Sequence, residues 1–285
     1  MEINGTDIAK RIYAHLQERV DRLKKKKIIP HLVVILVGEH PASVAYVTLK
    51  QKKAEQIGAK VTILQYKTDV TTDELREKIQ LLNDDPYVHG ILVQRPLPDQ
   101  IDVNALEMTT NPEKDIDGFH PKSSFTLPLP LSVVKILEET YQLQHPGQSS
   151  TKFHKWLQDQ NITLLGKGPT GGGPIIAHLK TLNVTPHLID SKTKNPDEIM
   201  KQADIMISAV GKRNTVKATD LKKGVILISV GLSRGEDKKL HGDYEVTEIK
   251  DIASYYTPTP GGVGPVNVAM LMENLLTAAE KQTKN

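Results

Sequence analysis

The chain has 285 residues, a formal net charge of +3 and no cysteine. Its length allows two cores of ordinary size, its small net charge excludes a nucleic-acid-binding role, and the lack of cysteine excludes disulfides, thiolate catalysis and cysteine-bound zinc. We expect a cytoplasmic protein with no membrane partner, because the N-terminal residues carry charges throughout and no apolar stretch approaches membrane-spanning length.

Strand and helix patterns alternate over the first 120 residues. A continuous apolar run that ends in glycine predicts a strand at residues 31–38, and the alternating pattern predicts further strands at residues 60–66 and 88–94. Helical spacing and capping signals predict helices at residues 8–23, 40–58 and 71–85, the last of which opens with a Thr-x-x-Glu capping sequence. This repeated alternation predicts a mostly parallel sheet with right-handed crossovers.

The pattern changes between residues 120 and 150, where a proline-rich loop, one helix and a polar stretch rich in Pro, Gly and Ser follow one another. We place a domain junction there. A second series of strands comes after it, at residues 162–166, 185–190, 204–210 and 224–231. The last helix carries an apolar stripe over residues 268–279, and we expect it to return to the first domain.

A glycine-rich loop follows the first strand of the second series. Gly166, Gly168 and Gly171 have G-x-G-x-x-G spacing between a strand and a helix, and Asp190 ends the next strand, 19 residues beyond Gly171. Such a loop turns tightly and lets the backbone approach a pyrophosphate at a helix N-terminus, while the carboxylate accepts ribose hydroxyls. We prefer this dinucleotide site to a glycine turn that only permits close packing, because strand, helix and carboxylate all match.

Charges near the same loop leave the choice of dinucleotide open. Lys167, Ser191 and Lys192 would suit a ribose phosphate and hence NADP. Asp190 would repel that phosphate and favour NAD.

Tyr46 and Lys50 lie four residues apart on a predicted helix and can therefore meet on one face. Taken alone, this pair is more typical of a packed ring under a lysine stem than of a catalytic site. The ten histidines form no H-x-x-x-H pair or carboxylate cluster, so we predict no catalytic metal.

Six stretches resemble, in this order, the bifunctional methylenetetrahydrofolate dehydrogenase/methenyltetrahydrofolate cyclohydrolase family. They are SVAYVTLKQKKAEQIG, GILVQRPLP, PEKDIDGFHP, ADIMISAVGK, ISVGL and TPTPGGVGPVNVAMLMENLL. The resemblance implies oxidation of 5,10-methylenetetrahydrofolate with NADP, or with NAD, and hydrolysis of the methenyl product to 10-formyltetrahydrofolate. It also implies a homodimer that serves one-carbon metabolism and purine biosynthesis.

The resemblance implies a catalytic set made of Tyr46, Lys50, Gln94 and Asp117. Lys50 would act as a base or water activator, because burial and a cationic substrate both disfavour its charged form. Tyr46 would position the substrate, and Gln94 would orient the lysine. Asp117 would hold the pterin ring through charge-assisted hydrogen bonds.

Further ligand contacts follow from the same resemblance. The folate contacts add Val93, Arg95, Pro260, Gly261, Gly262, Val263 and Gly264. The dinucleotide contacts are Gly166, Lys167, Gly168, Gly171, Asp190, Ser191, Lys192 and Leu232.

The chain departs from the family pattern at three places. Lys167 and Gly168 stand where the family usually has arginine and serine, which again leaves NADP or NAD open. Arg95 replaces a usual leucine, and Leu-Pro-Leu-Pro at residues 127–130 replaces Pro-Cys-Thr-Pro.

The predicted fold class is α/β, with two domains and mostly parallel sheets. A folate-binding catalytic domain would span residues 1–145 and include the returning helix at 264–285. A Rossmann-like NAD(P)-binding domain would span residues 146–263.

Two alternatives come from other functional classes. A non-catalytic sensor of dinucleotide or folate would keep the fold without turnover, and the altered glycine loop gives it some support. A short-chain dehydrogenase also uses Tyr-x-x-x-Lys, but its glycine loop precedes that pair, whereas here the loop follows it by more than a hundred residues.

Overall fold

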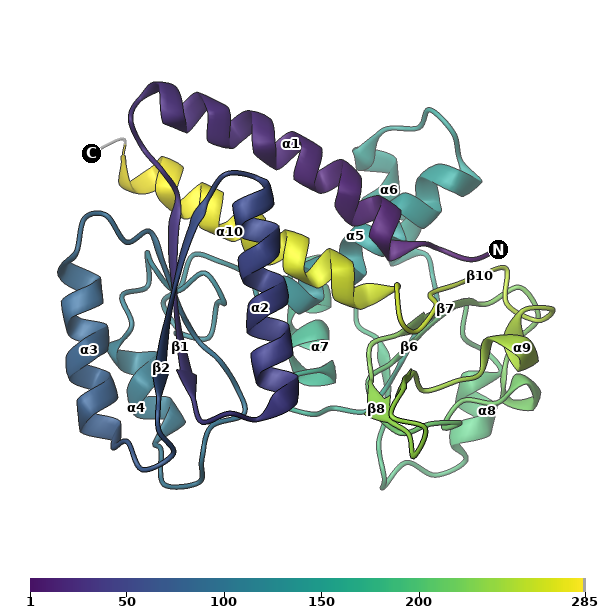
Figure 1. Ribbon diagram of the computed structural model, residues 1–285. Helices are drawn as coiled ribbons and strands as arrows, with labels where there is room; N and C mark the ends of the chain where they lie inside the picture. The colour runs from purple at the N-terminus through teal and green to yellow at the C-terminus, as the bar shows by residue number, and fades with distance from the viewer. Residues whose placement is uncertain (284–285) are drawn as a thin grey trace. The chain divides into compact units, whose positions relative to one another are not determined.

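Two parallel sheets and one short hairpin organise the chain in a computed structural model, which describes residues 1–283 without the side chain of residue 150 (Figure 1). The first sheet has the order β2-β1-β3, formed by β1 (His31–Val37), β2 (Lys60–Tyr66) and β3 (Gly90–Val93). The second has the order β10-β7-β6-β4-β5, formed by β4 (Ile162–Leu165), β5 (His187–Ile189), β6 (Ile205–Ser208), β7 (Ile226–Ser229) and β10 (Tyr255–Tyr256). The antiparallel hairpin pairs β8 (Ser233–Arg234) with β9 (Leu240–His241). The predicted α/β fold class with mostly parallel sheets is confirmed.

Helices connect these strands. They are α1 (Gly5–Lys25), α2 (Pro41–Gln56), α3 (Thr72–Asp84), α4 (Val103–Thr109), α5 (Pro128–Gln144), α6 (Ser150–Gln158), α7 (Gly172–Thr181), α8 (Pro196–Met200), the 3-10 helix η1 (Ala218–Asp220), α9 (Val246–Ile249) and α10 (Val263–Gln282). In the described residues 1–283, no helix is both long enough and apolar enough to cross a bilayer.

The chain divides into two compact units. The first unit combines Lys10–Pro128 with the chain from Val268 onward, and the second combines Met1–Ala9 with Leu129–Asn267. The first unit therefore holds the three-stranded sheet and the second holds the five-stranded sheet. The domain limits that we expect from the sequence stay a prediction.

Helices cover both faces of the first sheet, which explains why β1 is apolar along its whole length. All seven residues of β1 are buried. Val33 and Ile35 pack on one face with Leu75 of α3 and Leu106 of α4, and alternate residues of the strand point to the opposite face. Figure 1 shows α3 and α4 on one side of β1 and β2, and α2 on the other.

The capping sequence predicted for the third helix forms in the structure. Thr71 Oγ1 accepts a hydrogen bond from the Glu74 backbone N–H at 3.2 Å, and Glu74 Oε2 accepts one from the Thr71 backbone N–H at 2.7 Å. This reciprocal pair satisfies two backbone donors at the start of α3 and fixes where the helix begins.

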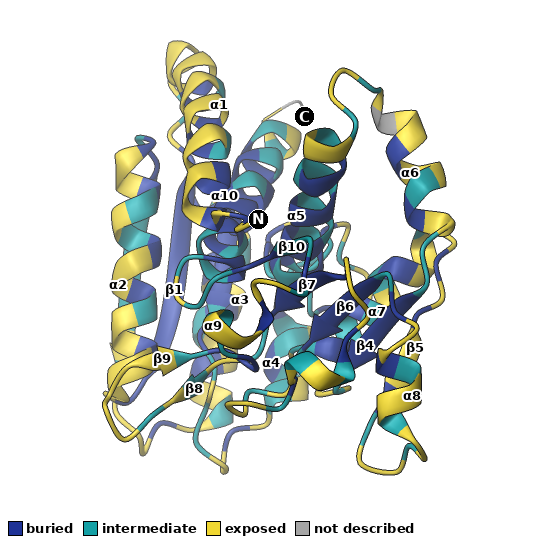
Figure 2. Ribbon diagram, turned by 90° about the vertical axis from the view of Figure 1, so that its right-hand side faces the viewer, coloured by how far each residue is buried: buried dark blue, intermediate teal, exposed yellow. Residues whose placement is uncertain are grey.

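The second unit has the strand order of a dinucleotide-binding sheet. Strands β4, β6 and β7 are buried throughout, as Figure 2 shows by their dark blue colour. β5 and β6 lie on opposite sides of β4, so the chain reverses direction across the sheet after β5. In open parallel sheets, ligands bind beside the carboxyl ends of the strands at such a reversal. The loops after β4 and β6 are therefore the natural place for a ligand in this unit.

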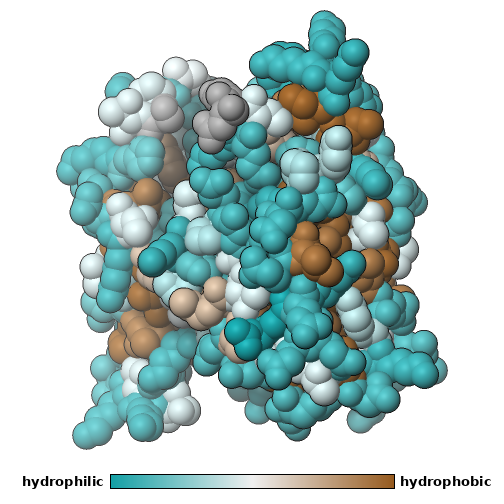
Figure 3. All heavy atoms as spheres, turned by 90° about the vertical axis from the view of Figure 1, so that its left-hand side faces the viewer, coloured by the Kyte–Doolittle hydropathy of each residue, from teal (hydrophilic) through white to brown (hydrophobic). Residues whose placement is uncertain are grey.

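Exposed apolar side chains are scattered rather than gathered on the face drawn in Figure 3, where hydrophobic groups stand apart among hydrophilic ones. The most exposed large apolar residues of the first unit are Leu81, Tyr87 and Met108. Single exposed residues of this kind are ordinary on protein surfaces.

Two buried histidines lie at the amino ends of β1 and β3 in the first sheet. The His31 backbone N–H donates to His89 Nδ1 at 3.2 Å, so this ring nitrogen carries no proton. Burial, together with the neighbouring His31 and Lys114, lowers the pKa of His89 from 6.5 to about 4. The folded protein therefore prefers the neutral ring, and this contribution to stability is present above pH 6.5 and is lost as the pH falls toward 4.

We expect His89→Asn to reduce the sensitivity of folding to acid. The asparagine carbonyl can still accept the His31 N–H but does not titrate in this range. After discounting for solvent screening, the free energy of unfolding should fall about 1–2 kcal/mol less between about pH 7 and about pH 4.5 than it does in the unchanged protein. Urea unfolding at the two pH values measures this, and an unchanged difference would show that His89 is not the titrating group.

Candidate functional site

A lysine amine is buried in the first unit. Lys50 lies on the buried face of α2 and is 5% exposed. Its Nζ donates to Gln94 Oε1 at 2.9 Å and lies 4.6 Å from the centroid of the Tyr46 ring. Helical spacing brings the tyrosine and lysine together, since residues four apart share a face.

The sheet positions the acceptor of that amine. Gln94 follows β3, and its backbone N–H donates to the Ile35 carbonyl of β1 at 2.9 Å, which extends the strand ladder. Its side-chain Nε2 donates to the Arg95 carbonyl at 2.6 Å. This bond fixes the amide orientation, so Oε1 faces the lysine.

Asp117 interacts with Lys50 through its charge. Burial lowers the pKa of Lys50 below its usual value of 10.5, and the charge of Asp117 opposes this effect. Burial likewise raises the pKa of Asp117 above its usual range, opposed by the charges of Lys50 and Arg95. The Lys50 amine therefore loses its proton more readily than a lysine in water does, and Asp117 is close enough for its charge to affect the pKa of that amine.

The Arg95 side chain interacts with two residues of the first unit. Its guanidinium forms an ion pair with Glu107 of α4 and stacks on the Phe119 ring, 3.8 Å from the ring centroid. Val93, Arg95 and Asp117 border a cavity of about 30 Å³, which also touches Glu107 and Phe119. Neither Glu107 nor Phe119 was singled out by the sequence, because nothing in their spacing points to Arg95.

The glycine loop after β4 has the geometry that a pyrophosphate site requires. Gly166 has a φ of +91°, and a Cβ added there would lie 2.8 Å from the Ala209 carbonyl oxygen. A Cβ on Gly168 would meet nothing within 4 Å, so the backbone is open to a ligand at that point. Helix α7 begins at Gly172 directly after this loop, and its N-terminus favours negative charge.

The glycine needed for close packing is Gly172, one residue beyond the position that the spacing indicates. A Cβ on Gly171 would come no nearer than 3.7 Å to another atom, whereas a Cβ on Gly172 would overlap the Gly166 carbonyl oxygen. Residues 171–173 are all glycine, so spacing alone could not decide between them.

Asp190 lies immediately after β5 with Lys167 bonded to it. Lys167 Nζ donates to Asp190 Oδ2 at 2.6 Å, and the Lys192 backbone N–H donates to Oδ1 at 2.9 Å. These bonds lower the pKa of Asp190 from 3.8 to about 2. Thr193, to which no sequence motif points, also donates to Oδ1, at 3.2 Å. Ser191 is exposed in the same turn.

The remaining predicted contacts also lie in the second unit. Leu232 is 53% exposed, three residues beyond the end of β7. In the segment from Pro260 to Gly264, Gly261 has a φ of +102°, and a Cβ on Gly262 would lie 2.8 Å from Thr257 Cβ. These glycines are needed for the turn into α10, which begins at Val263, while a Cβ on Gly264 would meet open space.

The structure thus gathers Tyr46, Lys50, Gln94 and Asp117 in the first unit, with Val93 and Arg95 beside them. It gathers the glycine loop with Asp190 in the second. Among residues 1–283, no three side chains of His, Asp or Glu converge on a point where a metal ion could be held.

Comparison with known proteins matches both units. The family model "Tetrahydrofolate dehydrogenase/cyclohydrolase, catalytic domain" matches residues 3–117, and "Tetrahydrofolate dehydrogenase/cyclohydrolase, NAD(P)-binding domain" matches residues 150–283. The "Bifunctional protein FolD" of Ligilactobacillus salivarius is 39% identical over 285 residues, covering 98% of this chain and 96% of its own.

Two solved structures have the same fold over nearly the full length. The bifunctional FolD methylenetetrahydrofolate dehydrogenase/cyclohydrolase of Campylobacter jejuni has a TM-score of 0.90 and 35% identity, with 99% of each chain covered. The Trypanosoma brucei enzyme, solved with NADP and an inhibitor, has a TM-score of 0.88 and 28% identity, covering 100% of this chain and 99% of its own.

Proposed function

The chain belongs to the tetrahydrofolate dehydrogenase/cyclohydrolase family, and we propose that it performs both reactions of that family with the residues described above. It oxidises 5,10-methylenetetrahydrofolate to 5,10-methenyltetrahydrofolate and hydrolyses the methenyl product to 10-formyltetrahydrofolate. The observation that supports this most strongly is the buried Lys50 amine, held by Gln94 and close to Asp117.

Hydrolysis needs a group that accepts a proton from water. The oxygen of water bonds to the cationic methenyl carbon, and Lys50 Nζ takes the released proton, since burial lowers the pKa of this amine. The hydroxyl group of the adduct then loses its proton and becomes the formyl oxygen as one carbon–nitrogen bond of the ring breaks. The departing nitrogen takes up one of the two protons that the water molecule has lost, and the other is released to solvent. Gln94 keeps the amine aimed through its 2.9 Å bond. Asp117 holds the pterin through charge-assisted hydrogen bonds.

The glycine loop fits a nicotinamide dinucleotide, because Gly168 leaves the backbone open and Gly166 supplies the tight turn. When bound, the oxidised dinucleotide supplies the acceptor for the hydride that leaves the methylene carbon. The chain's own part is to bind and orient the dinucleotide: the start of α7 would hold the pyrophosphate, and Asp190 with Lys167 would hold the ribose. Leu232 and the segment from Pro260 to Gly264 complete the proposed ligand contacts.

We propose NADP as the cofactor, with NAD as a second acceptor. NADP is bound in the Trypanosoma brucei relative. In this chain Lys167 is the cation placed to meet a 2′-phosphate, and it is bonded to Asp190, whose carboxylate would otherwise repel that phosphate.

Lys167→Ala should raise the KM for NADP about tenfold and change the KM for NAD much less. The variant leaves Asp190 without its cation, so the carboxylate repels a 2′-phosphate but still accepts the ribose hydroxyls of NAD. Initial rates with each dinucleotide measure the two KM values. An equal loss for both would reject the phosphate-binding role of Lys167.

The whole proposal is tested by two assays on the purified protein. Nicotinamide reduction with methylenetetrahydrofolate reports the dehydrogenase, and loss of the methenyl chromophore reports the cyclohydrolase. Tight binding of both ligands without turnover would instead make the protein a sensor.

The proposal extends to the setting of the enzyme. We propose that the enzyme is cytoplasmic, which its lack of cysteine favours. We also propose that it is a homodimer, as the family resemblance implies. Its product would supply one-carbon units to purine biosynthesis.

A further inference from the structure

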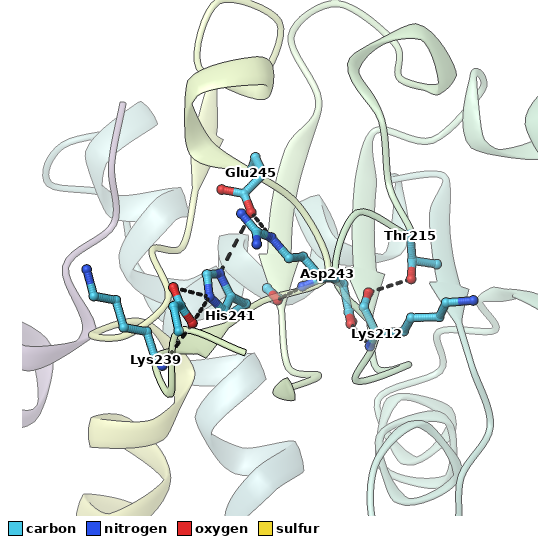
Figure 4. A network of polar contacts seen from close by, with 9 residues as sticks. Lys212, Thr215, Lys239, His241, Asp243 and Glu245 are labelled. Atoms are coloured by element: carbon cyan, nitrogen blue, oxygen red, sulfur yellow. Dashed lines mark hydrogen bonds and ion pairs between the residues drawn. The ribbon is translucent and has the colours of Figure 1, made fainter. Parts of the chain in front are cut away.

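A buried carboxylate lies at the carboxyl ends of β6 and β7. Asp243 follows β9 and has no exposed surface. Its Oδ2 accepts hydrogen bonds from Ser208 Oγ at 2.7 Å and from the Val210 backbone N–H at 3.1 Å. Its Oδ1 accepts from the backbone N–H groups of Gly211 at 2.8 Å and Lys212 at 2.9 Å (Figure 4). Four donors therefore converge on one side chain.

Three of those donors belong to consecutive residues of one loop. We call residues 209–212, which follow β6, the β6 loop. Successive backbone N–H groups that point to one centre form an anion-binding nest, and here the anion is supplied by the chain itself. The backbone of Asp243 is also fixed, because its N–H donates to Ser229 Oγ at 3.1 Å and its carbonyl accepts from Val216 N–H at 3.0 Å.

The same carboxylate joins the β6 loop to the chain after β7. Gly231 packs so closely that an added Cβ would lie 2.6 Å from Asp243 Oδ1. Gly211 has a φ of +72°, and a Cβ there would lie 3.2 Å from the Leu232 carbonyl oxygen. Asp243 thus holds two neighbouring loops in one arrangement.

Both loops reach the proposed dinucleotide site. Ala209 of the β6 loop lies against Gly166, the first residue of the glycine loop, at the close approach described above. Leu232, next to Gly231, is one of the proposed dinucleotide contacts. A shift of the β6 loop would therefore move Ala209, which lies against the glycine loop, and would also disturb Leu232, which lies beside Gly211.

We propose that Asp243 is a positioning residue for the dinucleotide: it touches no ligand but fixes the β6 loop and the start of the loop after β7 so that both fit the cofactor. This inference rests on the proposed function. A hydrogen bond that involves a charged group is stronger than a bond between neutral groups. The two oxygens of the Asp243 carboxylate can accept from all four donors, whereas an asparagine at this position would place its own NH₂ donor against some of them.

The test is Asp243→Asn in the full chain, which keeps the size of the side chain and removes its charge. We expect the Kd and the KM for NADP to rise at least tenfold, with kcat at saturating dinucleotide changed less than about threefold. Cyclohydrolase activity on methenyltetrahydrofolate should stay unchanged, since it depends on Lys50 in the other unit and consumes no dinucleotide.

Asp237→Asn is the matched control. Its carboxylate lies on the β8–β9 hairpin and accepts from His241 Nε2 at 3.0 Å and from the Lys239 backbone N–H at 3.0 Å. This change should leave NADP binding as it was. If the asparagine variant at 243 folds poorly, Ser208→Ala removes a single donor, and we expect it to raise the Kd for NADP about threefold.

Two results would overturn the proposal. One is a parallel loss of both activities, with a lower melting temperature, in both Asp243→Asn and Ser208→Ala, which would mean that the carboxylate only stabilises the unit. The other is unchanged NADP affinity. Direct titration of NADP onto the unchanged protein separates these results from a failure of the proposed function. If the proposed dinucleotide binding is wrong, the unchanged protein itself will bind no NADP.

Discussion

Replacing Lys50 with methionine should lower cyclohydrolase turnover at least a hundredfold and leave the protein folded. General-base catalysis by a positioned side chain contributes about 10²–10⁴ to a rate, and methionine has no atom that can take a proton. The fold should survive because the methionine stem fills most of the space of the lysine stem. The cost is an unpaired Gln94 Oε1, on the order of 1–3 kcal/mol.

The pH dependence of the unchanged enzyme should have a definite sign. Only the neutral amine accepts a proton, so cyclohydrolase turnover should rise with pH through the pKa of Lys50, which burial places below the usual 10.5. The residual turnover of the methionine variant should lose this dependence. Rates of methenyltetrahydrofolate hydrolysis across a pH series measure both effects.

Lys52→Met supplies the control, because Lys52 is exposed on the same helix. It should keep full turnover. Full turnover in the Lys50 variant, with circular dichroism unchanged, would remove the lysine from the mechanism and leave the other residues of the set to be assigned again.

The sequence predicted the parts of the fold whose signal is local. A continuous apolar run located β1 to within one residue, because a strand covered on both faces needs an apolar side chain at every position. The capping sequence of Thr71 and Glu74 located the start of α3, because these two side chains satisfy backbone donors within the same turn. Helix α4 and the β8–β9 hairpin were not predicted, since seven residues and two-residue strands are too short to display a period.

The candidate site shows the same limit. Helical spacing indicated that Tyr46 meets Lys50, but the contact between Lys50 and Gln94 spans 44 residues and depends on the register of β1 with β3. The resemblance to a family, rather than any spacing, pointed to Gln94. Asp243 was not singled out at all, because the donor to its carboxylate that is nearest along the chain lies 31 residues away.

The glycine loop offers the sharpest comparison between spacing and structure. We expect Gly172→Ala to lower the free energy of unfolding by about 3 kcal/mol, because an added Cβ would overlap the Gly166 carbonyl oxygen and lie 2.8 Å from Leu164 Cδ2. The backbone atom cannot rotate away, so α7 must move from β4. The start of that helix faces the pyrophosphate in our proposal, and the Kd for NADP should rise at least tenfold.

Gly171→Ala is the matched change one residue earlier. A Cβ there would have its nearest neighbour at 3.7 Å, which is ordinary van der Waals contact, so we expect a change in stability below about 1 kcal/mol. Urea unfolding and NADP titration on the two variants decide between the positions. Because the G-x-G-x-x-G spacing favours Gly171 and the packing favours Gly172, a larger loss at Gly171 would mean that α7 begins differently from the geometry described here. A larger loss at Gly172 would instead show that the third glycine of this loop is defined by the carbonyl it must clear.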